Sequence, residues 1–239
     1  SLNPQKKTVI FIHGAGGSHL TWESQKSLEN EFNFITVDLP GHGEAEGEAV
    51  KTLKDYAQVL HQGIHQEFSE LIPLILVGHS MAGGILQHYA LMYPDDLLGI
   101  VLIDTGAKLR VMNQILDQLP ENFEEVVEII VQYAFHRETD TQIVEKVKEQ
   151  FLSCSPLVML QDFKACNSFD LFNEIKNISI PTLIICGSDD LLTPPKFSKF
   201  LQTNIPDSKF VEIPEAGHMT MLEKPIALKQ ALKSFIKRL

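Results

Sequence analysis

The stretch PLILVGHSMAGGILQHYALMYP, residues 73–94, holds the point from which the fold can be worked out. Residues 74–77 form a short apolar run without a helical period, which is typical of a buried strand. Residues 81–93 suit a helix, and Pro94 ends it because proline cannot continue a helix. Ser80 lies between the two elements, where a strand that becomes a helix within one residue forces that residue toward positive φ. The sequence therefore predicts a serine hydroxyl raised above the edge of a sheet.

Small residues surround this serine, as such a turn requires. Gly78 and Ala82 flank it two residues away, and glycines follow at 83 and 84. The pentapeptide Gly-His-Ser-Met-Ala resembles the nucleophile elbow of the α/β-hydrolase family, with alanine where the commonest family pattern has glycine. An ordinary strand-to-helix loop is the alternative, but the strand before and the helix after are the context that the motif requires. The resemblance implies that Ser80 is a nucleophile.

Strand-like runs alternate with helical segments along most of the 239 residues, 44% of which are hydrophobic. This rhythm predicts one α/β domain, a mostly parallel central sheet with helices on both faces. Only seven residues precede the first strand, whereas many members of the resembling family begin with an extra hairpin. We therefore expect about six strands, with the FITVDL strand at an edge; the strand-like runs are 8–12, 34–39, 74–77, 100–103, 181–186 and 209–213.

The alternation of strands and helices stops between residues 107 and 176, where amphipathic helices are predicted instead. The clearest begins after Asn122, a predicted N-cap with Glu125 three residues later. Others follow Asp140 and open at Ser155. A helical insertion at this point resembles the lid of many α/β-hydrolases, which implies a core of 1–106 and 177–239 with a lid at 107–176. A peripheral bundle that only closes the core is the alternative.

The apolar faces of this insertion are candidates for the wall of an acyl pocket. They include Met112, Val158 and Met159, although apolar stripes usually belong to a core. Lys108 and Arg110 are candidates for an anionic group of a substrate. Exposed lid charges are the preferred interpretation of both.

The loop that follows the first strand reads His-Gly-Ala-Gly-Gly-Ser, residues 13–18. A glycine-rich turn can cradle phosphate, but this one lacks the Lys-Ser/Thr ending of a P-loop and the spacing of a dinucleotide fingerprint. In the resembling family, the matching loop lends a backbone amide to the oxyanion hole. The resemblance implies Ala15 as one donor and the amide of Met81 as the other.

The family resemblance also implies an acid and a base. Its pattern of an acid three residues after a strand-ending glycine selects Asp190, while the adjacent Asp189 and the earlier Asp104 stay open as alternatives. His218, in an Ala-Gly-His context after the last strand, matches the catalytic base. The order Ser80, Asp190, His218 is the family order. His79 is expected to pack rather than react.

Other residues that could react or bind a metal are given a structural interpretation. The segment Pro-Gly-His-Gly, residues 40–43, is predicted to be a tight turn. His61 and His65 lie four apart on a predicted helix, like a metal pair, but without a zinc-protease glutamate and without an apparent third ligand, so a solvated helix face is preferred. The three cysteines are predicted to be small buried apolar residues rather than disulfide or zinc partners.

Composition excludes several classes of function. The net charge of −11 and pI of 5.2 argue against a nucleic-acid surface. The chain has neither a run of ~20 apolar residues nor the apolar core of a signal peptide, so we expect no membrane span and a cytoplasmic location.

The sequence thus predicts a serine carboxylesterase for small or medium acyl esters, which needs no metal or organic cofactor. A serine at the elbow argues against dehalogenase and epoxide hydrolase chemistry, for which the resembling enzymes use aspartate. Lactonase, carbon–carbon bond hydrolase and acyltransferase activities use the same machinery and stay open. A ligand receptor with little turnover is the alternative from another class, and the oligomeric state is not predicted.

Overall fold

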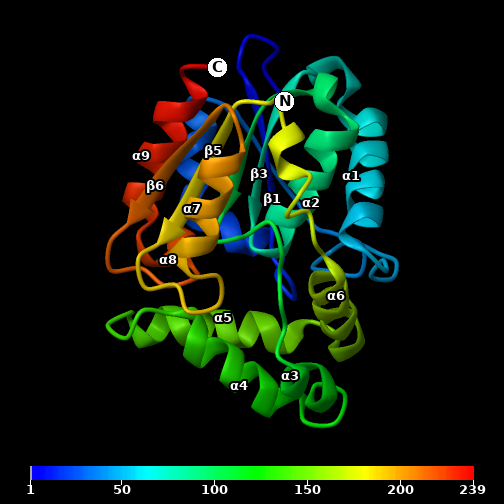
Figure 1. Cartoon of the computed structure of the whole chain (residues 1–239), viewed down its shortest axis with the longest axis vertical. Helices are drawn as coiled ribbons and strands as arrows, with labels where there is room; N and C mark the ends of the chain where they lie inside the picture. Colours follow the sequence, from blue (N-terminus) through cyan, green and yellow to red (C-terminus); the bar gives the residue numbers. More distant parts are fainter. Residues whose placement is uncertain (1) are drawn as a thin grey trace.

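The centre of the molecule is a sheet of six parallel strands in the order β2-β1-β3-β4-β5-β6 (Figure 1). The computed structural model describes residues 2–239. β2 lies at one edge of the sheet and β6 at the other. The prediction of about six parallel strands, with the FITVDL strand at an edge, is confirmed; the strands are β1 (Thr8–Ile12), β2 (Asn33–Val37), β3 (Leu74–His79), β4 (Leu97–Ile103), β5 (Thr182–Gly187) and β6 (Ser208–Ile213).

The inner strands are mainly apolar because alternate residues enter two different cores. In β3, Leu74 and Leu76 pack into one core, whereas Ile75 and Val77 pack into the other. Each face of the sheet is thereby covered by helices (Figure 1). One core receives α1 (Leu53–Phe68), α2 (Met81–Met92) and α7 (Pro195–Asn204), and the other receives the 3₁₀ helix η1 (His19–Asn30) and α9 (Pro225–Ile236).

The direction of winding reverses between β1 and β3. From β1 the chain continues to β2 on one side, and then returns to form β3 on the other side of β1. Ligands of open α/β sheets bind in the crevice at such a reversal, at the carboxyl ends of the strands. The loop at residues 13–18 follows the carboxyl end of β1, and Ser80 follows the carboxyl end of β3. Both therefore lie at this reversal.

Four α-helices are inserted between β4 and β5 and gather at one end of the sheet (Figure 1). The predicted helices after Asp140 and at Ser155 are confirmed, and Asp140 caps its helix by accepting a hydrogen bond from the amide of Gln142. We call these four the α3–α6 segment: α3 (Asn113–Gln118), α4 (Phe123–Ala134), α5 (Thr141–Ser153) and α6 (Pro156–Ser168).

Two local predictions are wrong. Asn122 precedes α4, but at φ −128° and ψ 50° its side chain forms no capping hydrogen bond within the described part of the chain, so no capping box forms with Glu125. Cys154 is only partly buried because it lies in the turn between α5 and α6, while Cys166 and Cys186 are buried as expected.

The remaining short helices are η2 (Ser69–Leu71), η3 (Pro94–Asp96), η4 (Ile175–Asn177) and α8 (Thr220–Glu223).

A helix must be both long and apolar to cross a bilayer. Across residues 2–239, no helix meets both requirements.

Candidate active site

Ser80 stands at the junction of β3 and α2 with φ 52° and ψ −113°, so the predicted positive φ is confirmed. Its backbone is fixed from both sides, since its amide donates to the carbonyl of Ile103 at 2.9 Å and its carbonyl accepts from the Thr105 hydroxyl at 2.8 Å. A Cβ atom at Gly78 would lie 2.8 Å from the carbonyl carbon and oxygen of Ala82. Glycine is therefore required there for the turn to close.

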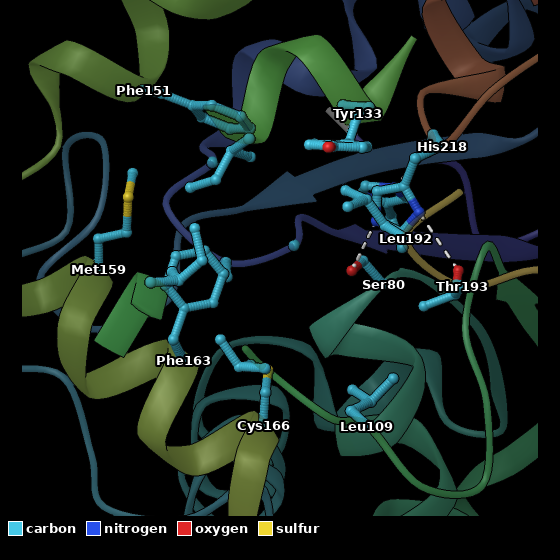
Figure 2. Close-up of a pocket in the computed structure, with 18 of the residues that line it drawn as sticks. Ser80, Leu109, Tyr133, Phe151, Met159, Phe163, Cys166, Leu192, Thr193 and His218 are labelled. Carbon is cyan, nitrogen blue, oxygen red and sulfur yellow. Dashed lines mark hydrogen bonds between the residues drawn. The ribbon is translucent and has the colours of Figure 1, made fainter. Parts of the chain in front are cut away.

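Three side chains from three separate loops meet at this point. The Ser80 hydroxyl lies 2.9 Å from Nε2 of His218, and Nδ1 of His218 lies 2.9 Å from Oδ2 of Asp190. Figure 2 shows Ser80 and His218 pointing toward each other at the edge of a pocket. Ser80, His218 and Asp190 are far apart in the sequence. The fold brings these three predicted site residues into one hydrogen-bonded chain.

Asp190 is held by three further hydrogen bonds at the end of β5. Its Oδ1 accepts from the amides of Leu192 at 2.9 Å and Thr193 at 2.8 Å, and its Oδ2 accepts from the Thr193 hydroxyl at 2.7 Å. The Thr193 hydroxyl oxygen also lies 3.2 Å from Nδ1 of His218 (Figure 2). Sequence reasoning missed Thr193, although a threonine three residues after an aspartate in a turn is a recognisable side-chain-to-backbone motif.

The electrostatics of the pair favour an ionised Asp190. Burial alone would raise the pKa of Asp190, but the charge of His218 and the hydrogen bonds from His218 and Thr193 outweigh burial and lower this pKa. Burial likewise disfavours the imidazolium of His218, but the charge and hydrogen bond of Asp190 raise the His218 pKa above its ordinary value. An imidazolium formed here is stabilised.

Within the described residues, neither alternative acid forms a hydrogen bond with His218. Asp104 is buried, and one of its carboxylate oxygens lies within 4.8 Å of one of Asp190. Its carboxylate accepts from the amide of Gly187 at 2.9 Å and from the Thr220 hydroxyl at 2.7 Å. Burial, and then the charge of Asp190, raise the pKa of Asp104 well above its ordinary value. Asp189 is exposed and receives the hydroxyl of Ser188 at 2.5 Å.

The two residues predicted to supply oxyanion amides, Ala15 and Met81, lie in the loop after β1 and directly after Ser80. Met81 is the first residue of α2, and a helix leaves its first amides without intrahelical acceptors. Ala15 lies in the loop after β1 and lines the same cavity as Ser80. The next two amides of that loop are already used: Gly16 donates to Asp162 at 3.0 Å and Gly17 to the carbonyl of Gly14 at 3.1 Å.

His13 fixes the start of this loop. Its Nδ1–H donates to the carbonyl of Gly14 at 2.8 Å, and its Nε2 accepts from the amide of Leu39 at 3.1 Å. Burial, reinforced by the nearby His42, lowers the pKa of His13 to about 4. A neutral imidazole with one donor and one acceptor matches both contacts.

A cavity of about 350 Å³ opens beside Ser80. Figure 2 shows apolar side chains of the α3–α6 segment across the cavity from Ser80 and His218. Of the three predicted wall residues, Met112 and Met159 line the cavity, whereas a methyl group of Val158 faces Gly41. The larger apolar lining residues are Leu109, Val111, Met112, Ile115, Ile129, Ile130, Tyr133, Phe151, Met159, Phe163, Leu191, Leu192 and Met219.

Asp162 of α6 links the inserted helices to the core. Besides the Gly16 amide, its carboxylate accepts hydrogen bonds from Nε2 of His42 at 2.7 Å and from the Tyr56 hydroxyl at 2.8 Å. The predicted tight turn at 40–43 is present, with its glycines at φ 81° and 52°, but His42 also belongs to this buried cluster. Sequence reasoning missed Asp162, although a lone carboxylate on the apolar side of an amphipathic helix was a usable signal.

Glu223 of α8 provides a second link. One carboxylate oxygen accepts from the amides of Gly217 at 2.9 Å and Met219 at 3.2 Å, on either side of His218. The other accepts from the amide of His136 at 2.8 Å and the hydroxyl of Thr139 at 2.6 Å, in the turn between α4 and α5. The loop that carries His218 is therefore tied to the α3–α6 segment.

His79 packs, as expected, but it also supports the base. Its Nε2–H donates to the carbonyl oxygen of His218 at 2.8 Å. Burial, and then the charge of His218, lower the pKa of His79 to about 3, so its ring stays neutral. The residue before Ser80 thus helps to position the loop of His218.

The two basic candidates of the insertion behave differently. Lys108 forms an ion pair with Asp170, as expected of a surface charge. Arg110 donates to the carbonyl of Asn167 at 3.1 Å and also lines the cavity. Among the described residues that line this cavity, Arg110 is the only lysine or arginine.

The interpretation of His61 and His65 as a solvated helix face is wrong in one respect. Both imidazoles lie within hydrogen-bonding distance of Asp96, a residue of η3 that sequence reasoning did not connect with them. The folding of α1 against the end of α2 brings the three side chains together.

Comparison with known proteins agrees with this geometry. The sequence profile of the alpha/beta hydrolase family matches residues 9–231. A pimeloyl-[acyl-carrier protein] methyl ester esterase of Wigglesworthia glossinidia brevipalpis is 26% identical over 255 residues, which cover 96% of this chain and 93% of that protein. A thermophilic esterase of known structure is 32% identical with a TM-score of 0.87, over 98% of this chain and 91% of that chain.

A more distant structure supports the same fold. The enol-lactonase from Burkholderia xenovorans LB400 is 19% identical with a TM-score of 0.91, over 98% of this chain and 92% of that chain. The agreement of fold, site geometry and sequence profile leads to one conclusion: the chain belongs to the alpha/beta hydrolase family.

Proposed function

We propose that this protein is a serine carboxylesterase that cleaves esters of small to medium acyl chains through an acyl-enzyme intermediate. The observation that carries the proposal is the chain of contacts from Ser80 through His218 to Asp190, which ends at a mostly apolar cavity. A serine is a weak nucleophile until a base within hydrogen-bond reach removes its proton. The 2.9 Å distance from Nε2 of His218 to the Ser80 hydroxyl supports His218 as that base. The esterase relatives point in the same direction.

The reaction begins when the Ser80 oxygen attacks the ester carbonyl while Nε2 of His218 takes the hydroxyl proton. Asp190 stabilises the imidazolium that forms. Collapse of the tetrahedral intermediate breaks the bond to the alkoxy group, which receives the proton from His218 and leaves as an alcohol. Water, deprotonated by the same histidine, then attacks the acyl-enzyme and releases the carboxylic acid.

The amides of Ala15 and Met81 are proposed to donate to the oxyanion. Such a donor contributes about 3 kcal/mol to transition-state stabilisation. Both amides belong to rigid backbone, since α2 fixes Met81 and the hydrogen bonds of Gly16 and Gly17 fix the Ala15 loop. The mechanism requires no metal and no organic cofactor.

The α3–α6 segment, within residues 107–176, is proposed to act as a lid and to supply the acyl pocket. A cavity of about 350 Å³ lined mainly by aliphatic and aromatic side chains suits a short or medium acyl chain. Closure over the site excludes water from the developing charges. The rest of the chain, 1–106 and 177–239, then forms the catalytic core.

The test combines covalent labelling with turnover. A fluorophosphonate probe is expected to label the wild-type protein, and p-nitrophenyl esters of increasing acyl length are expected to give a burst followed by steady hydrolysis. Ser80→Ala should abolish labelling and turnover, whereas Ser153→Ala, at an exposed serine of α5, should retain both.

Two outcomes would replace the proposal. Labelling with a burst but no steady turnover of any ester indicates a low-turnover ligand receptor. Negligible ester hydrolysis with rapid opening of a lactone, or with cleavage of a vinylogous diketone, reassigns the same residues to a lactonase or a carbon–carbon bond hydrolase.

A further inference from the structure

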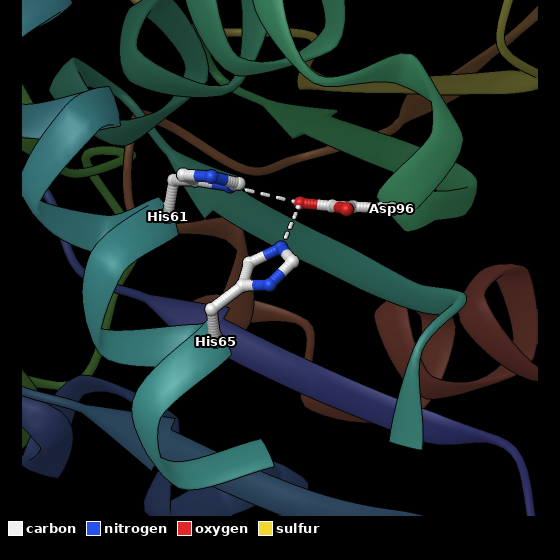
Figure 3. Close-up of side chains that lie close together, drawn as sticks. All are labelled: His61, His65 and Asp96. Carbon is white, nitrogen blue, oxygen red and sulfur yellow. Dashed lines mark hydrogen bonds and ion pairs between the residues drawn. The ribbon is translucent and has the colours of Figure 1, made fainter. Parts of the chain in front are cut away.

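Two imidazoles and a carboxylate converge on the flank of the molecule, between α1 and η3 (Figure 3). Nδ1 of His61 lies 2.9 Å from Oδ2 of Asp96, and Nε2 of His65 lies 3.0 Å from the same oxygen. One ligand atom from each residue can be chosen so that all three lie within 4.8 Å of one another. The side chains therefore point at a common centre from two elements that are distant in sequence.

The arrangement of donors at Asp96 is crowded. The hydroxyl of Tyr89 also donates to Oδ2, at 2.7 Å, so three donors share one carboxylate oxygen. A carboxylate oxygen offers about two lone-pair positions. A cation between the three residues would accept a lone pair from each imidazole and from the carboxylate. The two imidazole nitrogens would then bind the cation instead of competing with the Tyr89 hydroxyl for the same oxygen.

The distances suit a small divalent ion. In a tetrahedral site with metal–ligand bonds of 2.0–2.1 Å, the ligand atoms lie about 3.3 Å apart. The two nitrogen–oxygen distances of 2.9 and 3.0 Å are a few tenths of an ångström shorter, a difference that small side-chain rotations supply. Histidines four residues apart on a helix lie on one face, which is the spacing that a shared ion requires.

The surroundings hold two of the three ligands in place. The ring of His61 stacks on that of Tyr93, with centroids 3.7 Å apart and an interplanar angle of 3°. The Tyr89 hydroxyl orients the Asp96 carboxylate, as outer-shell donors do in metal sites. The side chain of His65 is 44% exposed, so it can adjust and leaves room for water as a fourth ligand.

We propose that His61, His65 and Asp96 bind a divalent transition-metal ion, with Zn²⁺ as the favoured ion. Two imidazoles, one carboxylate and water form a ligand set that suits zinc. The ion joins α1 to η3 and the start of β4. None of the three residues belongs to the lining of the cavity beside Ser80, so the site is structural rather than catalytic.

The experiment uses the full chain after treatment with a chelator and its removal. Titration with ZnCl₂ by calorimetry is expected to show one equivalent bound per chain. CoCl₂ should give the visible absorption of a tetrahedral complex. At a free Zn²⁺ concentration about 100 times Kd, the melting temperature should rise by about 5–10 °C, because the ion binds the folded state.

Matched histidine variants assign the site. His65→Gln and His61→Gln should each weaken Zn²⁺ binding by more than about tenfold, and Tyr89→Phe by about tenfold through the loss of an outer-shell donor. His136→Gln removes a histidine outside the cluster and should bind Zn²⁺ as the wild type does. The two histidine variants carry the test, because Asp96 is buried and its replacement also removes the acceptor of Tyr89.

Three results would overturn the proposal. The first is the absence of stoichiometric Zn²⁺ binding by the wild-type chain. The second is equal affinity in the wild type and His65→Gln. The third is binding that is lost in His218→Gln but kept in His61→Gln, which places the ion at the site beside Ser80.

Discussion

The carboxylate of Asp162 and the imidazole of His42 lie 2.7 Å apart, and both side chains are buried. Burial disfavours the imidazolium, but the hydrogen bond and charge of Asp162 outweigh burial and raise the pKa of His42 above its ordinary value. The pair joins α6 to the turn after β2, and the same carboxylate receives the Gly16 amide. One acidic side chain thus connects the inserted helices to the loop that faces Ser80.

The first prediction concerns the stability of this pair. Because the His42 pKa is raised on folding, the stabilisation is fully present below the unfolded pKa of about 6.5 and is lost as pH rises through the folded pKa. Asp162→Asn should lower the free energy of unfolding by about 3 kcal/mol at pH 6 and by less at pH 9. Urea unfolding at the two pH values measures this. An equal loss at both would show that the charge of His42 makes no contribution.

The second prediction concerns Glu223. Glutamine offers one acceptor oxygen, so Glu223→Gln leaves either the amides beside His218 or the 136–139 turn without an acceptor. We expect kcat to fall by about 10- to 100-fold as the base loses its position. Glu215→Gln is the matched control, because Glu215 lies on the loop that carries His218 and its side chain forms an exposed ion pair with Lys224. Similar kcat values for the two variants would contradict a positioning role for Glu223.

The third prediction decides between the three acidic candidates. Asp190→Asn should lower kcat for ester hydrolysis by about 10⁴-fold, because the amide no longer holds His218 in the required tautomer. Asp104→Asn should keep kcat within about tenfold, and Asp189→Asn should leave it unchanged. Steady-state kinetics on one p-nitrophenyl ester compare all three. A larger loss in Asp104→Asn than in Asp190→Asn would transfer the role to Asp104.

The fourth prediction is the pH profile. Neutral His218 is the proposed base, so activity should rise with pH through the raised pKa of His218, and the acid limb of kcat/KM should have its midpoint above pH 6.5. In Asp190→Asn this midpoint should move to lower pH, since the charge that stabilises the imidazolium is gone. An unshifted limb in that variant would assign the titration to another group.

The fifth prediction concerns the acyl pocket. Phe163→Ala widens the cavity, and the ratio of kcat/KM for octanoyl over butanoyl esters should rise by about tenfold or more. Leu157→Ala on the same helix is the control, because Leu157 is 74% exposed and faces away from the site. Equal ratios in Phe163→Ala and the wild type would place the acyl chain elsewhere.

The sheet and the junction at Ser80 were predictable because they depend on local patterns. The apolar runs define the strands, and the small residues at 78 and 82–84 define a turn that larger side chains cannot form. These features arise within a few residues of one another, where sequence is most informative. The edge position of β2 was predicted from the family resemblance, but the full strand order was not.

The contacts that join distant segments were not predictable. Asp162, Glu223 and Asp96 each accept from at least one donor more than 30 residues away along the chain. Nothing beside these carboxylates in the sequence indicates which distant donors they meet. The wall of the cavity was only partly foreseen for the same reason. Met159 and Val158 are neighbours on α6, yet one lines the cavity and the other faces Gly41.

The placement of the two linking carboxylates has a consequence for how substrate reaches Ser80. Asp162 fastens α6 and Glu223 fastens the α4–α5 turn, and Figure 1 shows these parts on opposite sides of the molecule. Because the α3–α6 segment is attached to the core on both sides, we do not expect it to open as one rigid body. Exchange of ester and product is therefore expected past Met112 and Leu191, two residues of the cavity lining that are 56% and 63% exposed.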